Sequence, residues 1–291
     1  MPQQMDIKSQ LRRFIPNVFW QTAGFCTRLP VYWRLDRSEH LRVRQRVEGL
    51  PLFVTPNACV FIPESVTAYM NWRSSAIECP DSSIEARDFL RLAEGRDSFF
   101  DVGAQTGFMS ALFACSRKGL ARLVSVEPDP QVECMLNRAR ELNMRSGVDW
   151  LICTEALSDC EGRFEMPICN YLRESMEVRP SSVRYASVRS RSLGSLIDQL
   201  GWKPDVIKID VESYEYEILN SSMDVIAELK PALQVEVHWK ILEDRKLDPD
   251  DFLVPLRQLG YRGIRSKYRD LPQWNRARSR ETVSRMSLVN G

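Results

Sequence analysis

The stretch Phe99–Phe108, FFDVGAQTGF, runs from apolar residues into a loop with two glycines and then into a second apolar segment. A buried strand that enters a glycine loop at the start of a helix is typical of α/β proteins that bind nucleotide-like ligands. Three residues separate Gly103 from Gly107, so the loop lacks the middle glycine that brings a backbone close to a pyrophosphate. The sequence therefore predicts a ligand without a pyrophosphate, and a tight turn without any ligand is the alternative.

The loop begins with an acidic residue, Asp101, which would repel a phosphate and attract a cationic group. S-adenosylmethionine suits such a loop because it carries a sulfonium, an ammonium and a carboxylate but no phosphate. Backbone N–H groups at the start of the following helix can bind that carboxylate. We therefore predict that S-adenosylmethionine is the cofactor, bound through Asp101, Gly103, Gln105 and Gly107.

Two later segments predict contacts to the rest of this cofactor. The apolar run VSV ends in Glu127 and Pro128, and a carboxylate at that strand end can accept both ribose hydroxyls. After the next expected strand, Leu157 can pack on the adenine, while Ser158 and Asp159 can bind its exocyclic amine. A polar turn without ligand contacts is the alternative for this segment.

From Asp81 onward, apolar strand-like segments alternate with helical ones, which predicts a mostly parallel sheet with helices on both faces. The expected strands span residues 98–103, 121–127, 148–156, 163–167, 205–211, 232–238, 261–268 and 282–289. The expected helices span residues 84–95 (with Ser82 and Glu85 as a capping box), 108–118, 130–143, 192–200, 214–230 and 250–260. In such an α/β sheet, ligands bind at the carboxyl ends of the strands.

The chain divides into an N-terminal extension over residues 1–80 and a larger domain over residues 81–291. We expect helical segments in the extension and a short hairpin built from LPLFVTP and CVFIPE. Its aromatic and basic residues also fit a lid, a dimer contact or a membrane-surface element. The chain shows no signal pattern, no apolar run of 18 residues and no C-x-x-C pair among eight cysteines, so we expect a cytoplasmic protein with reduced thiols.

Five segments together resemble the FkbM family of S-adenosylmethionine-dependent methyltransferases: DVGAQTGFMSALFA, VSVEPDP, ALSDCEG, DVIKIDVESYEYEIL and LQVEVH. The resemblance covers roughly residues 85–240, and the block KIDVE-x-x-E from Lys208 to Glu215 is its most specific part. It implies a Rossmann-like class I methyltransferase fold with a seven-stranded, mostly parallel sheet. It also implies O-methylation of a hydroxyl on a sugar, a glycan or another natural product.

The sequence departs from the family pattern in two places. The family usually has Asn where Gln105 stands, and Gln reaches one methylene further. The family usually has Gly-Ala where Ser213 and Tyr214 stand, and glycine there would permit a positive φ. We expect the second departure to change the shape of the acceptor pocket, with Tyr214 in its lining.

Methyl transfer to a neutral hydroxyl needs a group that takes up the hydroxyl proton. His238 is the preferred general base because an imidazole ordinarily titrates near neutrality, with Asp210 or Glu236 to orient it. Asp210 is also a candidate for the base itself or for a contact to the cofactor ammonium. Glu212 and Glu215 are candidates for binding acceptor hydroxyls or capping the next helix. We expect no metal, since sulfonium chemistry does not require one, although such side chains suit Mg, Mn or Fe.

Charge restricts the partners that we expect. The net charge of +1 gives no general case for nucleic acid. Residues 262–285 hold eight Arg or Lys, which either form a solvated face or attract an anionic acceptor, and an Arg-bearing loop at residues 173–191 would add to this charge. A cofactor-binding homologue without catalysis, acting in assembly, is the alternative function. An NAD-dependent oxidoreductase fits less well because of Asp101. The acceptor and the oligomeric state do not follow from the sequence.

Overall fold

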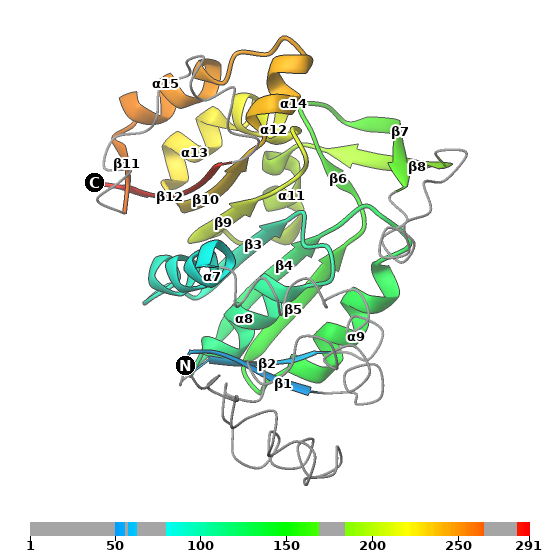
Figure 1. The fold of residues 1–291 in the computed structure, drawn as a ribbon, viewed down its shortest axis with the longest axis vertical. Coiled ribbons are helices and arrows are strands. Elements are labelled where there is room, and N and C mark those ends of the chain that lie inside the picture. Colours follow the sequence, from blue (N-terminus) through cyan, green and yellow to red (C-terminus); the bar gives the residue numbers. More distant parts are fainter. Residues whose placement is uncertain (1–49, 56–57, 63–79, 169–183, 265–283) are drawn as a thin grey trace, which may run out of the picture.

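The computed structural model describes residues 50–55, 58–62, 80–168, 184–264 and 284–291, and the account below concerns these residues. They form the seven-stranded, mostly parallel sheet that the sequence resemblance implied, with the strand order β11-β12-β10-β9-β3-β4-β5 (Figure 1). Its strands are β3 (Ser98–Val102), β4 (Ala121–Val126), β5 (Val148–Cys153), β9 (Val206–Ile209), β10 (Ala232–Val237), β11 (Tyr261–Gly263) and β12 (Ser284–Asn290). Five neighbouring strands are parallel, and β12 runs antiparallel to both β10 and β11.

The strand register aligns the carboxyl ends of neighbouring strands. Asp101 on β3 lies opposite Lys208 on β9, and Lys208 lies opposite Gln234 on β10. Val102 pairs with Val126 of β4 and with Ile209 of β9 in the same register. The carboxyl ends of β3, β4 and β9 therefore reach the same edge of the sheet.

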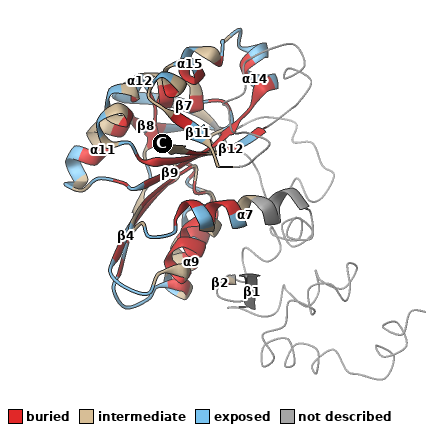
Figure 2. Ribbon diagram, turned by 90° about the vertical axis from the view of Figure 1, so that its left-hand side faces the viewer, coloured by how far each residue is buried: buried red, intermediate tan, exposed pale blue. Residues whose placement is uncertain are grey.

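Helices cover both faces of the sheet because successive strand residues point to opposite sides. Phe99 packs with the helices of one face, whereas Phe100 belongs to the core of the other face. The first face carries α7 (Pro80–Leu92), α8 (Phe108–Ser116) and α9 (Glu133–Asn143) (Figure 1). The second carries α11 (Leu193–Leu200), α12 (Glu215–Ser221), α13 (Met223–Leu229), α14 (Trp239–Asp244) and α15 (Asp250–Gln258). Figure 2 shows buried residues on the strands and on the helices that cover them.

An antiparallel hairpin of β1 (Leu50–Thr55) and β2 (Ala58–Ile62) confirms the hairpin expected from the sequence. β2 packs on α8 and α9. The buried amide of Asn143 on α9 holds this strand through both of its polar atoms. Its Oδ1 accepts from the N–H of Phe61 and its Nδ2 donates to the carbonyl of Phe61, both at 2.7 Å. Asn143 therefore pairs with β2 as a neighbouring strand would.

Three local expectations were wrong. Residues 184–191 of the expected Arg-bearing loop form strand β8 (Arg184–Arg191), which joins β6 (Ala156–Leu157) and β7 (Gly162–Ile168) in a small sheet. The expected helix over 214–230 breaks at Ser222, whose N–H donates to carbonyls of α12 while α13 begins at the next residue. Helix α7 begins at Pro80, so Ser82 lies inside its first turn and is not a cap before it.

Several expectations concern residues outside the described ranges. Residues 1–49 and 63–79 of the N-terminal extension, the first part of the Arg-bearing loop and most of the basic run lie there. Among the described residues, no helix has the length and apolar character needed to cross a membrane.

We predict that Asn143→Ala lowers the free energy of unfolding by about 2 kcal/mol, because the paired N–H and carbonyl of Phe61 lose their partner. Denaturant unfolding measures this loss, and hydrogen exchange at residues 58–62 should accelerate more than in the sheet. Asn137→Ala is the matched control, since the side chain of Asn137 bonds within α9. Unchanged exchange in β2 of the Asn143 variant would contradict the assigned role.

Candidate active site

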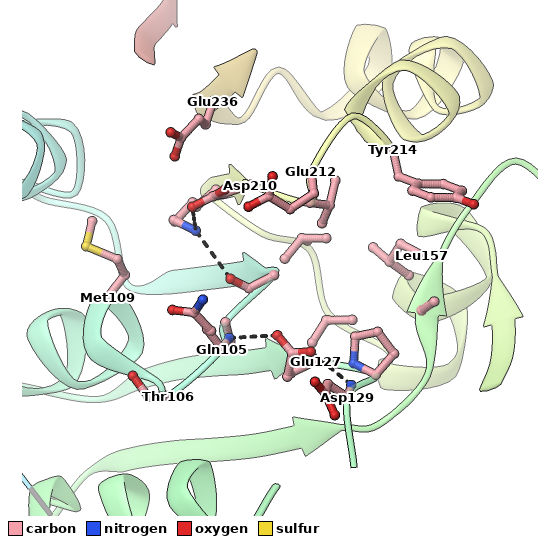
Figure 3. Close-up of a pocket in the computed structure, with 18 of the residues that line it drawn as sticks. Gln105, Thr106, Met109, Glu127, Asp129, Leu157, Asp210, Glu212, Tyr214 and Glu236 are labelled. Carbon is pink, nitrogen blue, oxygen red and sulfur yellow. Dashed lines mark hydrogen bonds and ion pairs between the residues drawn. The ribbon is translucent and has the colours of Figure 1, made fainter. Parts of the chain in front are cut away.

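A pocket of about 340 Å³ opens at the carboxyl ends of β3, β4, β9 and β10, at the edge where the sequence predicts the ligand (Figure 3). The residues that line it come from the glycine loop after β3, the start of α8, the ends of β4, β9 and β10 with the segment after β9, the small sheet, α7 and β12. They include Glu85, Gly103, Ala104, Gln105, Thr106, Met109, Glu127, Pro128, Asp129, Leu157, Met166, Lys208, Asp210, Val211, Glu212, Tyr214, Glu236 and Arg285.

Glycine is required at the two loop positions for different structural reasons. A Cβ on Gly103 would lie 1.8 Å from the carbonyl oxygen of Asp210, so any side chain would clash with the backbone of β9. Gly103 therefore lets β3 and β9 approach at the pocket floor. A Cβ on Gly107 would lie 2.6 Å from Leu136, so Gly107 allows α8 to pack on α9. Gly107 does not line the pocket, and its predicted role in cofactor binding is at most indirect.

Glu127 follows β4 and holds the glycine loop in place. One carboxylate oxygen accepts from the N–H of Gln105 at 2.8 Å, and the other accepts from the N–H of Asp129 at 2.9 Å. Burial raises the pKa of Glu127 to about 7, although both backbone hydrogen bonds act to lower it. Each oxygen has further acceptor capacity toward the pocket that Glu127 lines.

Asp101 does not line the pocket, contrary to the expectation from the sequence. Its carboxylate is fully buried behind the strand end, where Ser110 Oγ donates to it at 2.6 Å. Ser110 Oγ in turn lies 2.6 Å from Ser125 Oγ, which accepts from the indole of Trp150 at 2.8 Å. Burial raises the pKa of Asp101 despite the neighbouring Lys208. Asp101 is thus part of a buried network that joins β3, α8, β4 and β5.

Lys208 connects this network to the pocket. Its ammonium lies 3.7 Å from Asp101 and 3.2 Å from Asp210, and it donates to the carbonyl of Gly103 at 3.4 Å. Burial alone would lower the pKa of Lys208, but the two carboxylates outweigh it and raise the pKa. Asp210, and not Asp101, presents its carboxylate to the pocket.

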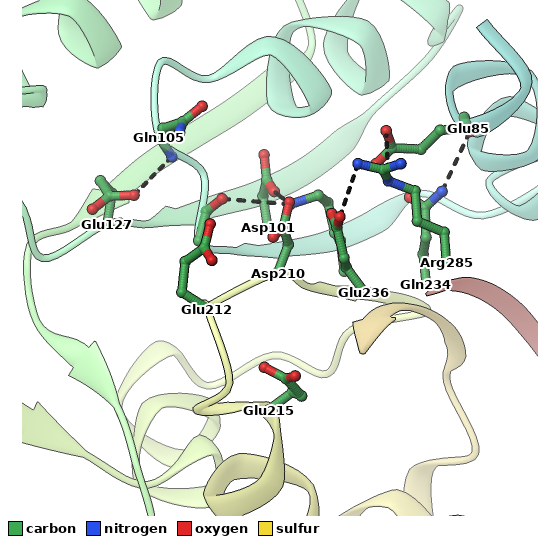
Figure 4. Close-up of polar contacts among 12 residues, drawn as sticks. Glu85, Asp101, Gln105, Glu127, Asp210, Glu212, Glu215, Gln234, Glu236 and Arg285 are labelled. Atoms are coloured by element: carbon green, nitrogen blue, oxygen red, sulfur yellow. Dashed lines mark hydrogen bonds and ion pairs between the residues drawn. The ribbon is translucent and has the colours of Figure 1, made fainter. Parts of the chain in front are cut away.

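Asp210 and Glu236 lie close together (Figure 4), and both carboxyl groups line the pocket. Burial would raise the pKa of Asp210, but Lys208 outweighs it and lowers the pKa to about 2. Burial and the Asp210 charge raise the pKa of Glu236 to about 8. Arg285 of β12 lies 2.8 Å from Glu236 and 3.3 Å from Glu85, and this limits the rise. The two carboxyl groups therefore have pKa values shifted in opposite directions, so a shared proton is favoured on Glu236.

His238 lies next to this pair but is absent from the pocket lining. Its Nε2 lies 3.3 Å from Glu212, and its Nδ1 lies 3.4 Å from the buried Glu215. Glu215 also accepts from the backbone N–H of His238 at 2.8 Å, so it is not the capping or acceptor-binding group that the sequence suggested. Burial would lower the pKa of His238, but these carboxylates raise it to about 9. A pKa raised in this direction favours a cationic imidazole over the near-neutral base that the sequence suggested.

Of the three cofactor contacts predicted after β5, the structure places one residue in the pocket lining and the other two outside it. Leu157 is buried and lines the pocket, and Pro128, which follows β4, also lines it. Ser158 and Asp159 are absent from the lining, and Ser158 Oγ donates to Asp159 at 2.9 Å. Contacts from Ser158 and Asp159 to the adenine stay a prediction. The hydrogen bond between these two side chains favours the alternative, a polar turn without ligand contacts.

Sequence reasoning missed Lys208, Glu85 and Arg285 as site residues. Lys208 had a readable signal, because a lysine between apolar strand residues and two positions before Asp210 shares a strand face with that carboxylate. Glu85 and Arg285 are far apart in the sequence and meet only after β12 pairs with β10 and α7 packs beside it.

A comparison with protein families shows which family this geometry belongs to. The sequence model described as "Methyltransferase FkbM domain" matches residues 101–262, which is more than half of the chain. The chain belongs to the FkbM methyltransferase family. Residues 101–262 are therefore a methyltransferase domain of this family, as the sequence resemblance implied. A comparison with curated proteins found no match.

Several solved methyltransferase structures are similar to this chain at low identity. The FkbM methyltransferase from Methylobacillus flagellatus KT is 19% identical with a TM-score of 0.36, covering 60% of this chain and 43% of its own. An O-methyltransferase from Bacillus cereus in complex with SAH is 12% identical with a TM-score of 0.37, covering 71% and 80%. TomG from Streptomyces achromogenes, in complex with SAM, is 12% identical with a TM-score of 0.38, covering 80% and 92%. This chain spans less than half of the FkbM structure's length.

The residues of the pocket fit the charge and shape of S-adenosylmethionine. Gly103 brings the loop backbone against the strand ends, and Glu127 offers acceptor oxygens to a ribose. Asp210, ionised at neutral pH, and Glu212 suit the cationic end of the cofactor. When bound, the cofactor supplies an activated methyl group on a sulfonium.

We predict that the affinity for S-adenosylhomocysteine rises with pH and levels off above about pH 7, because only ionised Glu127 offers full acceptor capacity to the ribose. Below that pH the raised pKa leaves Glu127 protonated, so binding at pH 6 should be about tenfold weaker than at pH 8. Calorimetric titration measures this. Glu127→Gln should bind weakly with little pH dependence, and an equal pH dependence in that variant would assign the effect elsewhere.

We predict that Asp101→Ala destabilises the protein by about 3–5 kcal/mol, because the buried Lys208 loses one of two carboxylate partners. The folded fraction should bind S-adenosylhomocysteine nearly as the wild type does. Denaturant unfolding and calorimetry separate the two effects, with Asp149→Ala on the exposed side of β5 as the matched control. If Asp101→Ala kept the stability of the wild type but lost S-adenosylhomocysteine binding, the result would support the direct cofactor contact that the sequence suggested.

Proposed function

We propose that this methyltransferase methylates a hydroxyl oxygen on a neutral, polyhydroxylated acceptor such as a sugar, a glycan or a hydroxylated natural product. The observation that supports it best is the group of carboxyl side chains at one end of the pocket: Glu85, Asp210, Glu212 and Glu236. Carboxylates accept hydrogen bonds from hydroxyls, and one of them can take up the proton that a methylated hydroxyl must lose.

The proton acceptor in this proposal is the Asp210–Glu236 pair. At neutral pH the pair shares one proton, since the pKa of Glu236 is raised to about 8 and that of Asp210 is lowered to about 2. In this state the pair is a weak base, with Glu236 able to donate a hydrogen bond. Above pH 8 both carboxyls are ionised, and the pair becomes a base with a pKa close to the working pH.

His238 supports this pair in the proposal and does not take the proton itself. With its pKa raised to about 9, the imidazole is cationic at neutral pH and lies between Glu212 and Glu215. Its positive charge favours the ionised form of Asp210. This assigns His238 a different role from the general base expected from an unperturbed imidazole.

Charge in the pocket favours a neutral acceptor over an anionic one. The described lining holds six acidic side chains, Glu85, Glu127, Asp129, Asp210, Glu212 and Glu236, and two basic ones, Lys208 and Arg285. Both basic groups already lie beside carboxylates. The basic run that suggested an anionic acceptor lies mostly outside the described residues and gives this idea no support here.

Lys208 and Arg285 also take the charge-balancing role that a metal would have. Asp210, Glu236 and His238 each offer a ligand atom, and these atoms lie within 4.8 Å of one another. However, Lys208 lies 3.2 Å from Asp210 and Arg285 lies 2.8 Å from Glu236. A divalent ion would have to displace these cations and a protonated imidazole, so we propose a metal-independent reaction.

The experiment that tests this function is methyl transfer from radiolabelled S-adenosylmethionine to a panel of free sugars, oligosaccharides, hydroxylated polyketides and sugar phosphates. NMR of the products identifies the atom that carries the new methyl group and so distinguishes O-methylation from N-methylation. We predict O-methylation of a neutral member of the panel, and a clear preference for sugar phosphates would contradict the acceptor class.

With the preferred acceptor, we predict that kcat/KM rises tenfold per pH unit below about pH 8 and then levels off, because Glu236 must lose its proton. Glu236→Gln should lower kcat by about 100-fold or more and abolish this rise. Donor affinity should stay near that of the wild type. Two results would instead assign the base role to His238. The pH dependence of kcat/KM could keep its midpoint in Glu236→Gln, or it could be lost only in His238→Gln.

A further inference from the structure

Tyr214 lies at the end of the pocket that the acidic pair does not occupy. Figure 3 shows its ring at the same end as Leu157, whereas Glu236 lies at the other end. Tyr214 lines the pocket, and 40% of the residue's surface is exposed. Tyr214 therefore lies on the side of the pocket away from Glu236.

Arg245, which follows α14, backs this ring. Its guanidinium carbon lies 5.2 Å from the ring centroid of Tyr214, within the range of a cation–π contact. The same guanidinium donates to the carbonyl of Ser213 at 2.9 Å and to its Oγ at 3.0 Å, and it pairs with Glu217 on α12. One side chain thus fixes the backbone before Tyr214, the helix after it and one side of its ring.

The backbone at this point is held in an unusual conformation. Glu212 and Ser213 have φ values of 51° and 85°, in the left-handed region that residues with a Cβ rarely adopt. The two hydrogen bonds from Arg245 to the buried Ser213 offset the cost of this turn. The turn carries Tyr214 to the start of α12 at the pocket edge. This gives the Ser-Tyr departure from the family's Gly-Ala a structural reason.

We propose that the ring of Tyr214 stacks on the adenine of the methyl donor, opposite Leu157, and that Arg245 is the positioning residue that holds the ring there. The proposal rests on the donor pocket described under the proposed function and deepens it. It replaces the expectation that Tyr214 shapes the acceptor pocket. A flat aromatic ring with a cation on one face suits the π-face of a purine on the other.

The test compares two ligands that differ only by the base, S-adenosylhomocysteine and S-ribosylhomocysteine, in calorimetric titrations. Tyr214→Ala should weaken S-adenosylhomocysteine binding at least fivefold, as expected for loss of base stacking. It should leave S-ribosylhomocysteine binding within twofold of wild type. Tyr214→Phe keeps the ring and should stay within twofold for both ligands. Tyr185→Ala on β8, also an exposed tyrosine, is the matched control and should change neither.

Arg245→Ala should weaken S-adenosylhomocysteine binding about two- to fivefold, since the ring loses the cation and the fixed turn behind it. S-ribosylhomocysteine binding should again stay unchanged. Arg257→Ala is the control, because that arginine pairs with Asp250 on α15. A general loss of local structure would weaken both ligands equally, so only the selective loss supports a positioning role.

Three results would overturn the stacking proposal. Equal weakening of both ligands in Tyr214→Ala would show a structural role, and no weakening would show that the ring does not contact the base. If Tyr214→Ala does not fold, Tyr214→Leu replaces it, and binding equal to Tyr214→Phe would exclude stacking. If the wild type binds S-adenosylhomocysteine tightly, failure here leaves the proposed function intact. If the wild type binds neither ligand, both proposals fall together.

Discussion

The ion pairs of Lys208 are the interaction on which the site depends. A buried ammonium is costly unless it is paired, and Lys208 has two carboxylates and the carbonyl of Gly103 within reach. These contacts tie the end of β3 to the end of β9, where Gly103 lets the backbones approach. As a result, the two aspartates have different roles. Asp101 is buried as a structural partner, and Asp210 faces the pocket in its ionised form.

The two ends of the pocket differ in their side chains. One end has Tyr214 and Leu157 in its lining, and these side chains suit an adenine. The other end has the Asp210–Glu236 pair, with Lys208 and Arg285 limiting its negative charge. The two ends meet the needs of methyl transfer separately, because the donor must be held and the acceptor must lose a proton.

The alternation of strands and helices was predictable because each strand is a short apolar run bounded by turn residues, as in VSVEPDP and DVIKIDV. Gly103 and Glu127 were predictable for the same reason, since strand ends gather at one edge of a parallel sheet. The direction of Asp101 was not, because it lies within β3 and its carboxylate turns toward Ser110 on α8. The raised pKa of His238 depends on Glu215, which lies 23 residues earlier in the chain. Such effects depend on tertiary contacts that no local pattern contains.

The most direct measurement of the central claim is a crystal structure of the protein with S-adenosylhomocysteine. The account predicts that Glu127 accepts hydrogen bonds from the ribose hydroxyls, that the amino-acid end lies by Gly103 and Asp210, and that the sulfur faces the side of Glu236. It also predicts that Asp101 makes no contact with the ligand. A ligand bound elsewhere, or bound in this pocket with its sulfur directed away from the Asp210–Glu236 pair, would contradict it.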